Sequence, residues 1–201
     1  VQMAVEAMKL GAHSYLTKPL NLQEMRLVVS QAVRSRQLVL ENEKLRGELE
    51  SRYGFDRLIG KNHHMQKVYD LIRNLQNTVA NVLIYGEPGT GKELAANIIH
   101  FNSQRKDKPF VRVDCTGLQE KLLEGELFGH VPGAFESVSG SAQGAFEKAR
   151  GGTVFLKHVH ALSLSLQAKL LRVLQEGLFE PLGGDKTIET DARVICSTHM
   201  D

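Results

Sequence analysis

The sequence has 201 residues, a formal net charge of +2 and 24% charged residues. At this length the chain can form one large domain or two small ones, and no basic stripe indicates nucleic-acid binding. No apolar run approaches the roughly 20 residues that a membrane-spanning helix needs, and no signal-peptide pattern opens the chain. Cys115 and Cys196 are isolated in apolar, strand-like settings, which favours buried thiols and a reducing cytoplasm.

The N-terminal quarter of the chain is predicted to be helical apart from one short strand. Residues 1–10 have the spacing of an amphipathic helix, and residues 14–16 are predicted to form a short strand that ends before Lys18-Pro19. Asn21 can cap a second helix that begins near Leu22.

Residues 37–49 are rich in Glu, Lys, Arg and Leu, and Leu38, Leu45 and Leu49 follow heptad-like steps. Because fewer than three heptads are present, the pattern fits both a short dimerising coiled coil and a solvated connecting helix. Gly54 then breaks the helical pattern.

The rest of the chain alternates between short apolar runs and helical periodicity. Strands are expected over residues 81–85, 109–114, 153–156 and 192–197, and helices over residues 64–77, 93–99, 118–127 and 164–176. This alternation predicts an α/β fold with a mainly parallel, doubly wound sheet that holds a nucleotide at its carboxyl edge.

Residues 86–93 have the spacing of a phosphate-binding loop, Gly86-Glu87-Pro88-Gly89-Thr90-Gly91-Lys92-Glu93. Main-chain N–H groups of such a loop point at phosphate oxygens, and Lys92 supplies a mobile cation for the outer phosphates. A strand precedes the loop and a helix follows it, so the phosphates would meet a helix N-terminus. Glu93 departs from the general motif, which has Ser or Thr there for magnesium. The competing interpretation is a glycine-rich turn without a ligand.

Further motifs follow the loop in order: Glu126-Leu127-Phe128-Gly129-His130, Gly133-Ala134-Phe135, Phe146-Glu147-Lys148-Ala149, Gly151-Gly152-Thr153 and Leu170-Leu171-Arg172-Val173-Leu174-Gln175-Glu176-Gly177. With these motifs, the segment from about Leu58 to Asp201 resembles the AAA+ domain of bacterial sigma-54-dependent transcriptional activators, which also carry Glu after the loop lysine. The resemblance implies a P-loop fold, ATP as the cofactor, and a ring that remodels RNA polymerase holding sigma-54.

Residues 11–20, Gly-Ala-His-Ser-Tyr-Leu-Thr-Lys-Pro-Leu, resemble the end of a response-regulator receiver domain. The resemblance implies that Lys18 contacts a phosphorylated aspartate and that Tyr15 is the switch aromatic. The aspartate would lie upstream of Val1, so a cognate sensor kinase would act only through a complete receiver. An ordinary Lys-Pro turn is the alternative. The chain then divides into a receiver remnant (residues 1–34), a helical linker (residues 35–54) and a C-terminally truncated AAA+ domain (residues 55–201).

Lys157 and His158 stand where the third strand of the family ends in Asp-Glu, the pair that organises magnesium and polarises the attacking water. At about 4 Å and an effective dielectric near 20, each unit-charge pair is worth roughly 4 kcal/mol, so exchanging Asp for Lys gives a nominal penalty above about 10 kcal/mol for a dication. We therefore treat Mg2+ as doubtful and expect hydrolysis to be lost or very weak. As a further hypothesis, the Lys157 ammonium replaces the metal and supports metal-independent nucleotide binding.

Other positions of the implied machinery are also changed. The family's switch asparagine falls at Asp114, and its sensor asparagine falls at His199. The sigma-contact loop, Gly-Ala-Phe-Thr-Gly-Ala in the family, is here Gly133-Ala134-Phe135-Glu136-Ser137-Val138. The added charge and the lost glycine predict weakened or lost sigma-54 contact. The alternative is a tolerant surface loop.

His158 and His160 are expected to alternate at the strand end, and as a pair they lack a third and fourth ligand, so no metal site is expected. Taken together, the motifs predict a fragment of a two-component transcriptional regulator that binds ATP and self-associates as a dimer or ring. Three alternatives stay open: a sigma-54-independent regulator that uses nucleotide as an assembly switch, an active sigma-54 activator ATPase, and an inactive truncated product. We expect a cytoplasmic location, no membrane partner and no DNA-binding domain in this chain.

Overall fold

The computed structural model describes residues 18–52, 62–134 and 140–200, together with Glu6, Ala12, Ser14 and Leu16. These residues fall into two compact units, Val1–Arg52 and Tyr53–Asp201. Tyr15, the residues Phe135, Glu136, Ser137 and Val138, and all of the expected helix over residues 1–10 except Glu6 lie outside the described residues.

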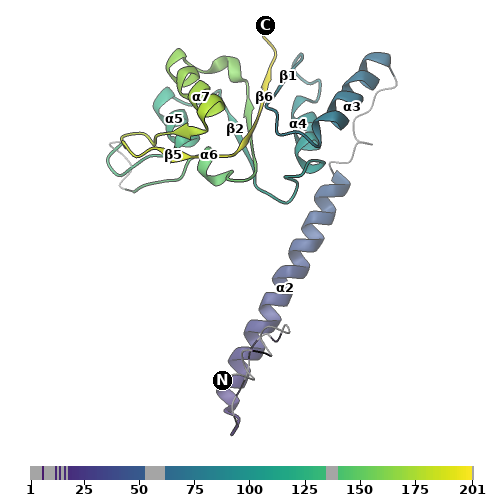
Figure 1. Cartoon of the computed structure of the whole chain (residues 1–201), viewed down its shortest axis with the longest axis vertical. Helices are drawn as coiled ribbons and strands as arrows, with labels where there is room; N and C mark the ends of the chain where they lie inside the picture. The colour runs from purple at the N-terminus through teal and green to yellow at the C-terminus, as the bar shows by residue number, and fades with distance from the viewer. Residues whose placement is uncertain are drawn as a thin grey trace. The chain divides into compact units, whose positions relative to one another are not determined.

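The N-terminal unit contains the helix α2 (Leu22–Arg52), shown in Figure 1. The expected cap is confirmed, because Asn21 Oδ1 accepts a hydrogen bond from the Gln23 amide at 2.9 Å. The helix continues through the expected boundary between residues 34 and 35 without interruption. Ser14 and Leu16 belong to no strand, so the short strand expected there is wrong. A strand needs a hydrogen-bonded neighbour, and the described residues of this unit contain none.

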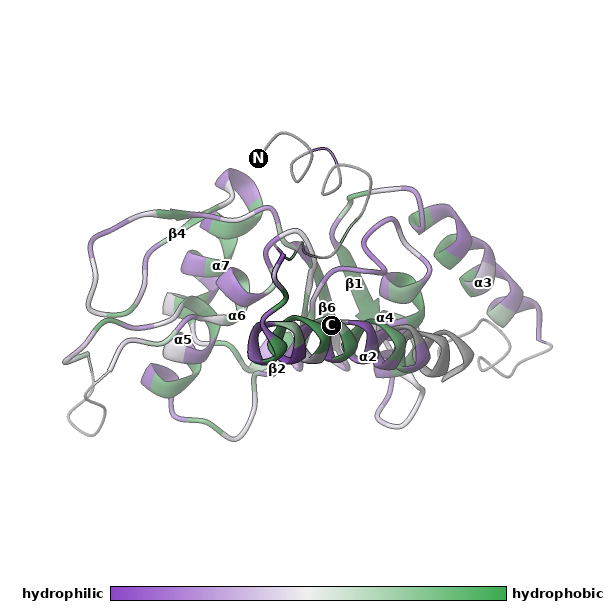
Figure 2. Cartoon of the chain, turned by 90° about the horizontal axis from the view of Figure 1, so that it is seen from below, coloured by the Kyte–Doolittle hydropathy of each residue, from purple (hydrophilic) through white to green (hydrophobic). Residues whose placement is uncertain are grey.

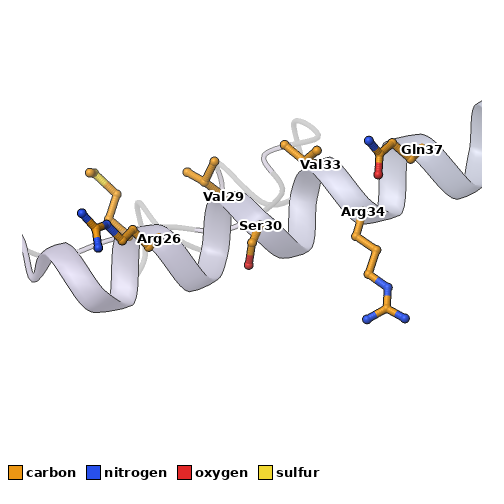
Figure 3. A pocket seen from close by; sticks show the side chains of 7 residues that line it. Arg26, Val29, Ser30, Val33, Arg34 and Gln37 are labelled. Atoms are coloured by element: carbon orange, nitrogen blue, oxygen red, sulfur yellow. The ribbon is translucent and has the colours of Figure 1, made fainter.

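Apolar side chains of α2 are exposed along much of its length: Leu22, Leu27, Val29, Val33, Leu38, Val39, Leu40 and Leu45. In Figure 3, Val29, Val33 and Gln37 project from one side of α2, and Ser30 and Arg34 from the other. Residues of α2 line a shallow hollow of about 620 Å³. This hollow shares no residue with the phosphate loop. The coiled-coil and connecting-helix interpretations both stay predictions.

The second unit is built on a parallel sheet, as the sequence predicts. Its order is β1-β6-β3-β2, and neighbouring strands pair in parallel. The strands are β1 (Val82–Tyr85), β2 (Phe110–Asp114), β3 (Thr153–Lys157) and β6 (Arg193–Thr198). All four strands therefore direct their carboxyl ends to one edge of the sheet.

Helices cover both faces of this sheet. On one face, α3 (His63–Leu75) and α4 (Lys92–Phe101) pack on Phe155 and Ile195. On the other face, α5 (Glu120–Phe128), α6 (Ala145–Lys148) and α7 (Leu164–Glu176) pack on Val154, Leu156 and Val194. Alternate residues of β3 and β6 thus serve opposite cores, and Figure 2 shows the mainly hydrophobic course of β1 and β6.

Four short elements are absent from the sequence prediction: the helix α6, the 3-10 helix η2 (Val159–Ala161), and the antiparallel strands β4 (Leu178–Phe179) and β5 (Ile188–Glu189). Two-residue strands and a single turn are too short to produce a periodic pattern. Among the residues that the structure describes, no helix has the length and apolar character needed to cross a membrane.

The two cysteines are free, Cys115 buried and Cys196 partly buried, as expected from their apolar surroundings. Burial, together with the nearby Cys196, Asp114 and Glu126, raises the pKa of the Cys115 thiol to about 12. Burial raises the pKa of Cys196 to about 11. Both thiols therefore stay protonated at neutral pH, and a protonated thiol is a poor nucleophile.

Candidate functional site

The phosphate loop turns between β1 and α4. Gly91 has a left-handed φ of 86° and caps α4 without a side-chain hydrogen bond. A Cβ at Gly86 would come 3.0 Å from Thr90 Oγ1, and this hydroxyl donates to the Glu87 carbonyl oxygen at 2.8 Å. The loop is thus compact, and the first N–H groups of α4 are positioned for an anionic ligand.

Lys92 is folded back over this loop. Its Nζ donates to the carbonyl oxygens of Gly86 and Glu87, each at 2.7 Å. Exchanging a carbonyl oxygen for a phosphate oxygen keeps the hydrogen bond and adds the attraction of opposite charges. The ammonium is therefore placed to bind phosphate without first breaking an ion pair.

Glu93 connects the loop to the ends of β2 and β3. Its carboxylate lies 3.2 Å from Arg112 Nη1 and 3.4 Å from Lys157 Nζ. Lys157 Nζ also lies 3.4 Å from Asp114 Oδ2. This meeting follows from the strand register, because β2 pairs with β3 so that Asp114 is opposite Lys157. We call Glu93, Arg112, Asp114 and Lys157 the charge cluster.

The ion pairs set the ionisation of the cluster. Burial alone would lower the pKa of Lys157, but the carboxylates of Glu93 and Asp114 outweigh it and raise that pKa. Desolvation alone would raise the pKa of Asp114, but hydrogen bonds from His158 and Thr116 outweigh it and hold that pKa well below its usual range. Both Lys157 and Asp114 therefore carry full charge at neutral pH.

His158 and His160 do not alternate on a strand, so that expectation is wrong. β3 ends at Lys157, and His158 adopts a left-handed φ of 56° as the chain turns into η2. His is among the residues that tolerate this conformation. Its Nδ1 lies 3.0 Å from Asp114 Oδ1, which places the ring proton on Nδ1.

A third histidine, His199, lies close to this pair. Its ring centroid is 4.5 Å from that of His160 and 6.2 Å from that of His158. Burial, and then the charges of His199 and His158, lower the pKa of His160. The part of the chain that the structure describes contains no group of three His, Cys, Asp or Glu residues arranged to hold a metal ion. The rings pack edge to face, with interplanar angles of 80° and 86° at His199.

The end of β6 joins the histidines to the phosphate loop. The Gly86 amide donates to the Thr198 carbonyl oxygen at 3.2 Å, and Thr198 Oγ1 lies 3.1 Å from His160 Nδ1. His199 follows Thr198 directly. The loop, the charge cluster and the three histidines therefore form one continuous carboxyl edge of the sheet.

Of the expected sigma-contact loop, only Gly133 and Ala134 are described. The Ala134 amide donates to the Val131 carbonyl oxygen at 3.2 Å, and the Val131 amide donates to Leu182 at 3.1 Å. The base of the loop is thus attached to the segment that follows β4. The role assigned to Phe135 and to the changed residues after it stays a prediction.

The structure brings together the residues predicted at the carboxyl edge: Asp114, Lys157, His158 and His199. Lys18 is exposed and belongs to the N-terminal unit. The sequence analysis missed two residues of this edge. Arg112 pairs with the Glu93 carboxylate, and the Thr116 hydroxyl donates to Asp114 Oδ1 at 2.7 Å. Strand periodicity offers a signal for Arg112, because residues two apart on β2 share a face with Asp114.

Comparison with known proteins identifies the second unit. Residues 58–201 match the family model described as the Sigma-54 interaction domain. The chain belongs to this family. Its mainly parallel sheet and phosphate loop agree with the α/β P-loop AAA+ fold expected from the sequence.

Several curated proteins are similar over most of the chain. Regulatory protein AtoC of Escherichia coli (strain K12) is 42% identical over 201 residues, covering all of this chain and 44% of AtoC. The Nif-specific regulatory protein of Azotobacter vinelandii is 45% identical over 180 residues, covering 89% of this chain and 34% of that protein. The chain thus spans less than half the length of the curated relatives that it matches.

Solved structures of NtrX from Brucella abortus share the architecture. One has 32% sequence identity and a TM-score of 0.72, and covers 100% of this chain and 43% of NtrX. A second, of NtrX in complex with ATP, has 32% identity and a TM-score of 0.69, and covers 100% of this chain and 41% of NtrX.

Proposed function

We propose that this sigma-54 interaction domain binds ATP through residues 86–93 and hydrolyses it very weakly or not at all. In this proposal the chain is part of a cytoplasmic two-component transcriptional regulator. Lys92 neutralises the outer phosphates, and the amides of Gly89, Thr90 and Gly91 donate to phosphate oxygens. The compact loop and the ATP complex of the related NtrX support this part.

The position of Lys157 carries the second part of the proposal. Its ammonium lies between the carboxylates of Glu93 and Asp114, each at 3.4 Å. Phosphoryl transfer depends mainly on positioning and on charge stabilisation by a metal ion and its ligands. A cation at the end of β3 opposes that arrangement and supplies no carboxylate to polarise water.

His158 does not restore the missing base in this proposal. A general base must present an unprotonated nitrogen to the attacking water. The Nδ1 of His158 is engaged by Asp114 at 3.0 Å, so only Nε2 could accept a proton. Without a metal ion to gather charge on the phosphate, that single group supplies a small part of the barrier reduction.

The wider role is that of a signalling switch. Residues 1–34 would be the end of a receiver domain, with Lys18 and Tyr15 as its switch residues and a sensor kinase as its partner. Residues 35–54 would link it to the AAA+ domain, which self-associates as a dimer or ring. Contact with RNA polymerase and sigma-54 would be weakened by Glu136, Ser137 and Val138. The exposed apolar residues of α2 support self-association.

The test combines binding and turnover on the full chain. Calorimetric titration should give saturable ATP binding, while phosphate release with Mg2+ should not exceed that of Lys92→Ala. Sustained ATP turnover well above that variant would overturn the proposed loss of hydrolysis. Absence of ATP binding by folded protein would overturn the binding role.

A further inference from the structure

The residues at the carboxyl edge do not fit the magnesium ion that usually accompanies ATP in P-loop proteins. Such proteins hold Mg2+ with a loop Ser or Thr hydroxyl and an Asp at the end of a neighbouring strand. Here Lys157 holds the strand-end place, whereas Glu93 at the loop place is shared with the activators that the sequence resembles. The nearby carboxylates of Glu93 and Asp114 are both paired with the Lys157 ammonium, at 3.4 Å.

We propose that the chain binds the free, metal-free form of a nucleoside triphosphate, with the Lys157 ammonium supplying the positive charge that a magnesium ion would bring. The inference rests on the proposed function, because it assumes that the phosphate loop binds ATP. It adds the chemical form of the ligand and the residue that selects it.

Lys157 is close to where the phosphates would lie. Glu93 belongs to the first turn of α4 and directly follows Lys92, the loop cation. An ammonium 3.4 Å from the Glu93 carboxylate is therefore beside the helix N-terminus that faces the phosphates. The side chain is 31% exposed, and its four-carbon stem allows it to move toward a ligand.

Lys157 can also serve a phosphate while keeping its present partners. An ammonium has three N–H donors, and two carboxylates face it, one from Glu93 and one from Asp114. One donor remains for a phosphate oxygen. The carboxylates raise the pKa of Lys157 against the opposing effect of burial, so its charge is permanent at neutral pH, as that of a metal ion is.

The charge balance of the cluster disfavours a second cation. Lys157 and Arg112 neutralise Glu93 and Asp114, so the cluster carries no net charge. A dication would have to displace Lys157 or lie beside it, and like charges at this separation repel strongly in a partly buried site. Lys157→Asp changes the cluster from neutral to doubly negative, which would attract Mg2+.

The test is calorimetric titration of the full chain with ATP, first with Mg2+ and then with EDTA. We expect the two dissociation constants of the wild-type chain to agree within about threefold. Lys157→Asp should bind ATP at least about tenfold more weakly in EDTA, and Mg2+ should restore the affinity. Lys157→Met, which removes the charge without adding a carboxylate, should bind weakly in both media.

Lys148→Asp is the matched control. It makes the same charge change at an exposed residue of α6, which packs on the sheet face opposite α4. The ATP dissociation constants of this variant, with Mg2+ and with EDTA, should agree as they do in the wild-type chain. Circular dichroism checks that each variant is folded, and Lys157→Met carries the test if Lys157→Asp does not fold.

The outcomes separate the inference from the proposed function. Wild-type binding that requires Mg2+ would overturn the inference and leave the ATP-binding role standing. Metal-independent binding that Lys157→Met leaves unchanged would overturn the role of Lys157. No binding by folded protein in either medium would overturn both.

Discussion

The phosphate loop and the charge cluster adjoin one another, but their cations have different partners. Lys92 donates to two main-chain carbonyl oxygens, whereas Lys157 is shared by two carboxylates. A phosphate can replace neutral partners readily, while a metal ion must compete with a charged one. These contacts support the proposals that the loop accepts an anion and that the cluster disfavours a second cation. The comparison teaches that, in the proposed function, nucleotide binding depends on the loop and hydrolysis on a separate set of groups at the ends of the neighbouring strands.

The largest effect on ATP affinity is expected from removing Lys92, the cation of the phosphate loop. Lys92→Ala should weaken ATP binding by about 10- to 150-fold with or without Mg2+, because a charge-assisted hydrogen bond to phosphate is worth about 1.5–3 kcal/mol. Isothermal titration measures the change. Lys121→Ala, at an exposed residue of α5, is the control and should bind as the wild-type chain does. Equal affinity in both variants would show that the loop does not hold the phosphates.

As the pH falls, the free energy of unfolding should drop first through His100, on α4, and only at lower pH through Asp114, in the charge cluster. Burial, together with the charges of Arg193 and Arg105, lowers the pKa of His100 to about 4 despite a main-chain hydrogen bond with Lys108. Below about pH 6.5 the unfolded chain takes up a proton that the folded chain does not, so stability falls as pH drops toward 4. Asp114 has a depressed pKa, so its contribution is lost only below its unfolded value, about pH 4.

The free energy of unfolding should therefore fall by about 2 kcal/mol between about pH 7 and about pH 4.5 through His100 alone. Urea denaturation at the two pH values measures it. His100→Asn removes the titrating group and should flatten this dependence, although it will also lower stability at neutral pH. If the free energy of unfolding of His100→Asn falls as much between the two pH values as that of the wild-type chain, the acid sensitivity belongs to another group.

Placing carboxylates at the end of β3 tests whether the missing acids are the reason for the proposed loss of hydrolysis. The double variant Lys157→Asp with His158→Glu places two acids at the end of β3, and we expect ATP turnover with Mg2+ to rise at least about tenfold. Phosphate release measures the rate. The gain should vanish when Lys92→Ala is added. A double variant that binds MgATP but turns over no faster would locate the defect at Asp114 or His199 instead.

The sequence predicts the sheet well because its strands are apolar runs bounded by clear turn signals. The phosphate loop is recognisable because its glycines and its lysine all lie within residues 86–92, at a fixed spacing. The charge cluster depends on long-range pairing, since Asp114 and Lys157 meet only through the register of β2 and β3. No local pattern contains that register.

The histidines show the same limit. His158 and His160 are visible as a pair in the sequence, but His199 joins them only because β6 lies next to β3 in the sheet. The strand-end placement of His158 is wrong because β3 ends at Lys157, the residue before it, and His158 turns the chain with a positive φ. The domain boundaries and the receiver remnant stay predictions.

The smallest effect is expected at Arg112, the second cation of the charge cluster. Its pair with Glu93 is 45% and 43% exposed, and exposed ion pairs contribute between zero and about 1 kcal/mol. Arg112→Ala should therefore change the free energy of unfolding by less than about 1 kcal/mol, much as Arg73→Ala should at the exposed pair with Asp70. ATP affinity in EDTA should change by less than about threefold, because Lys157 still faces Glu93. A loss above about tenfold would instead make Arg112 the cation that supports metal-free binding.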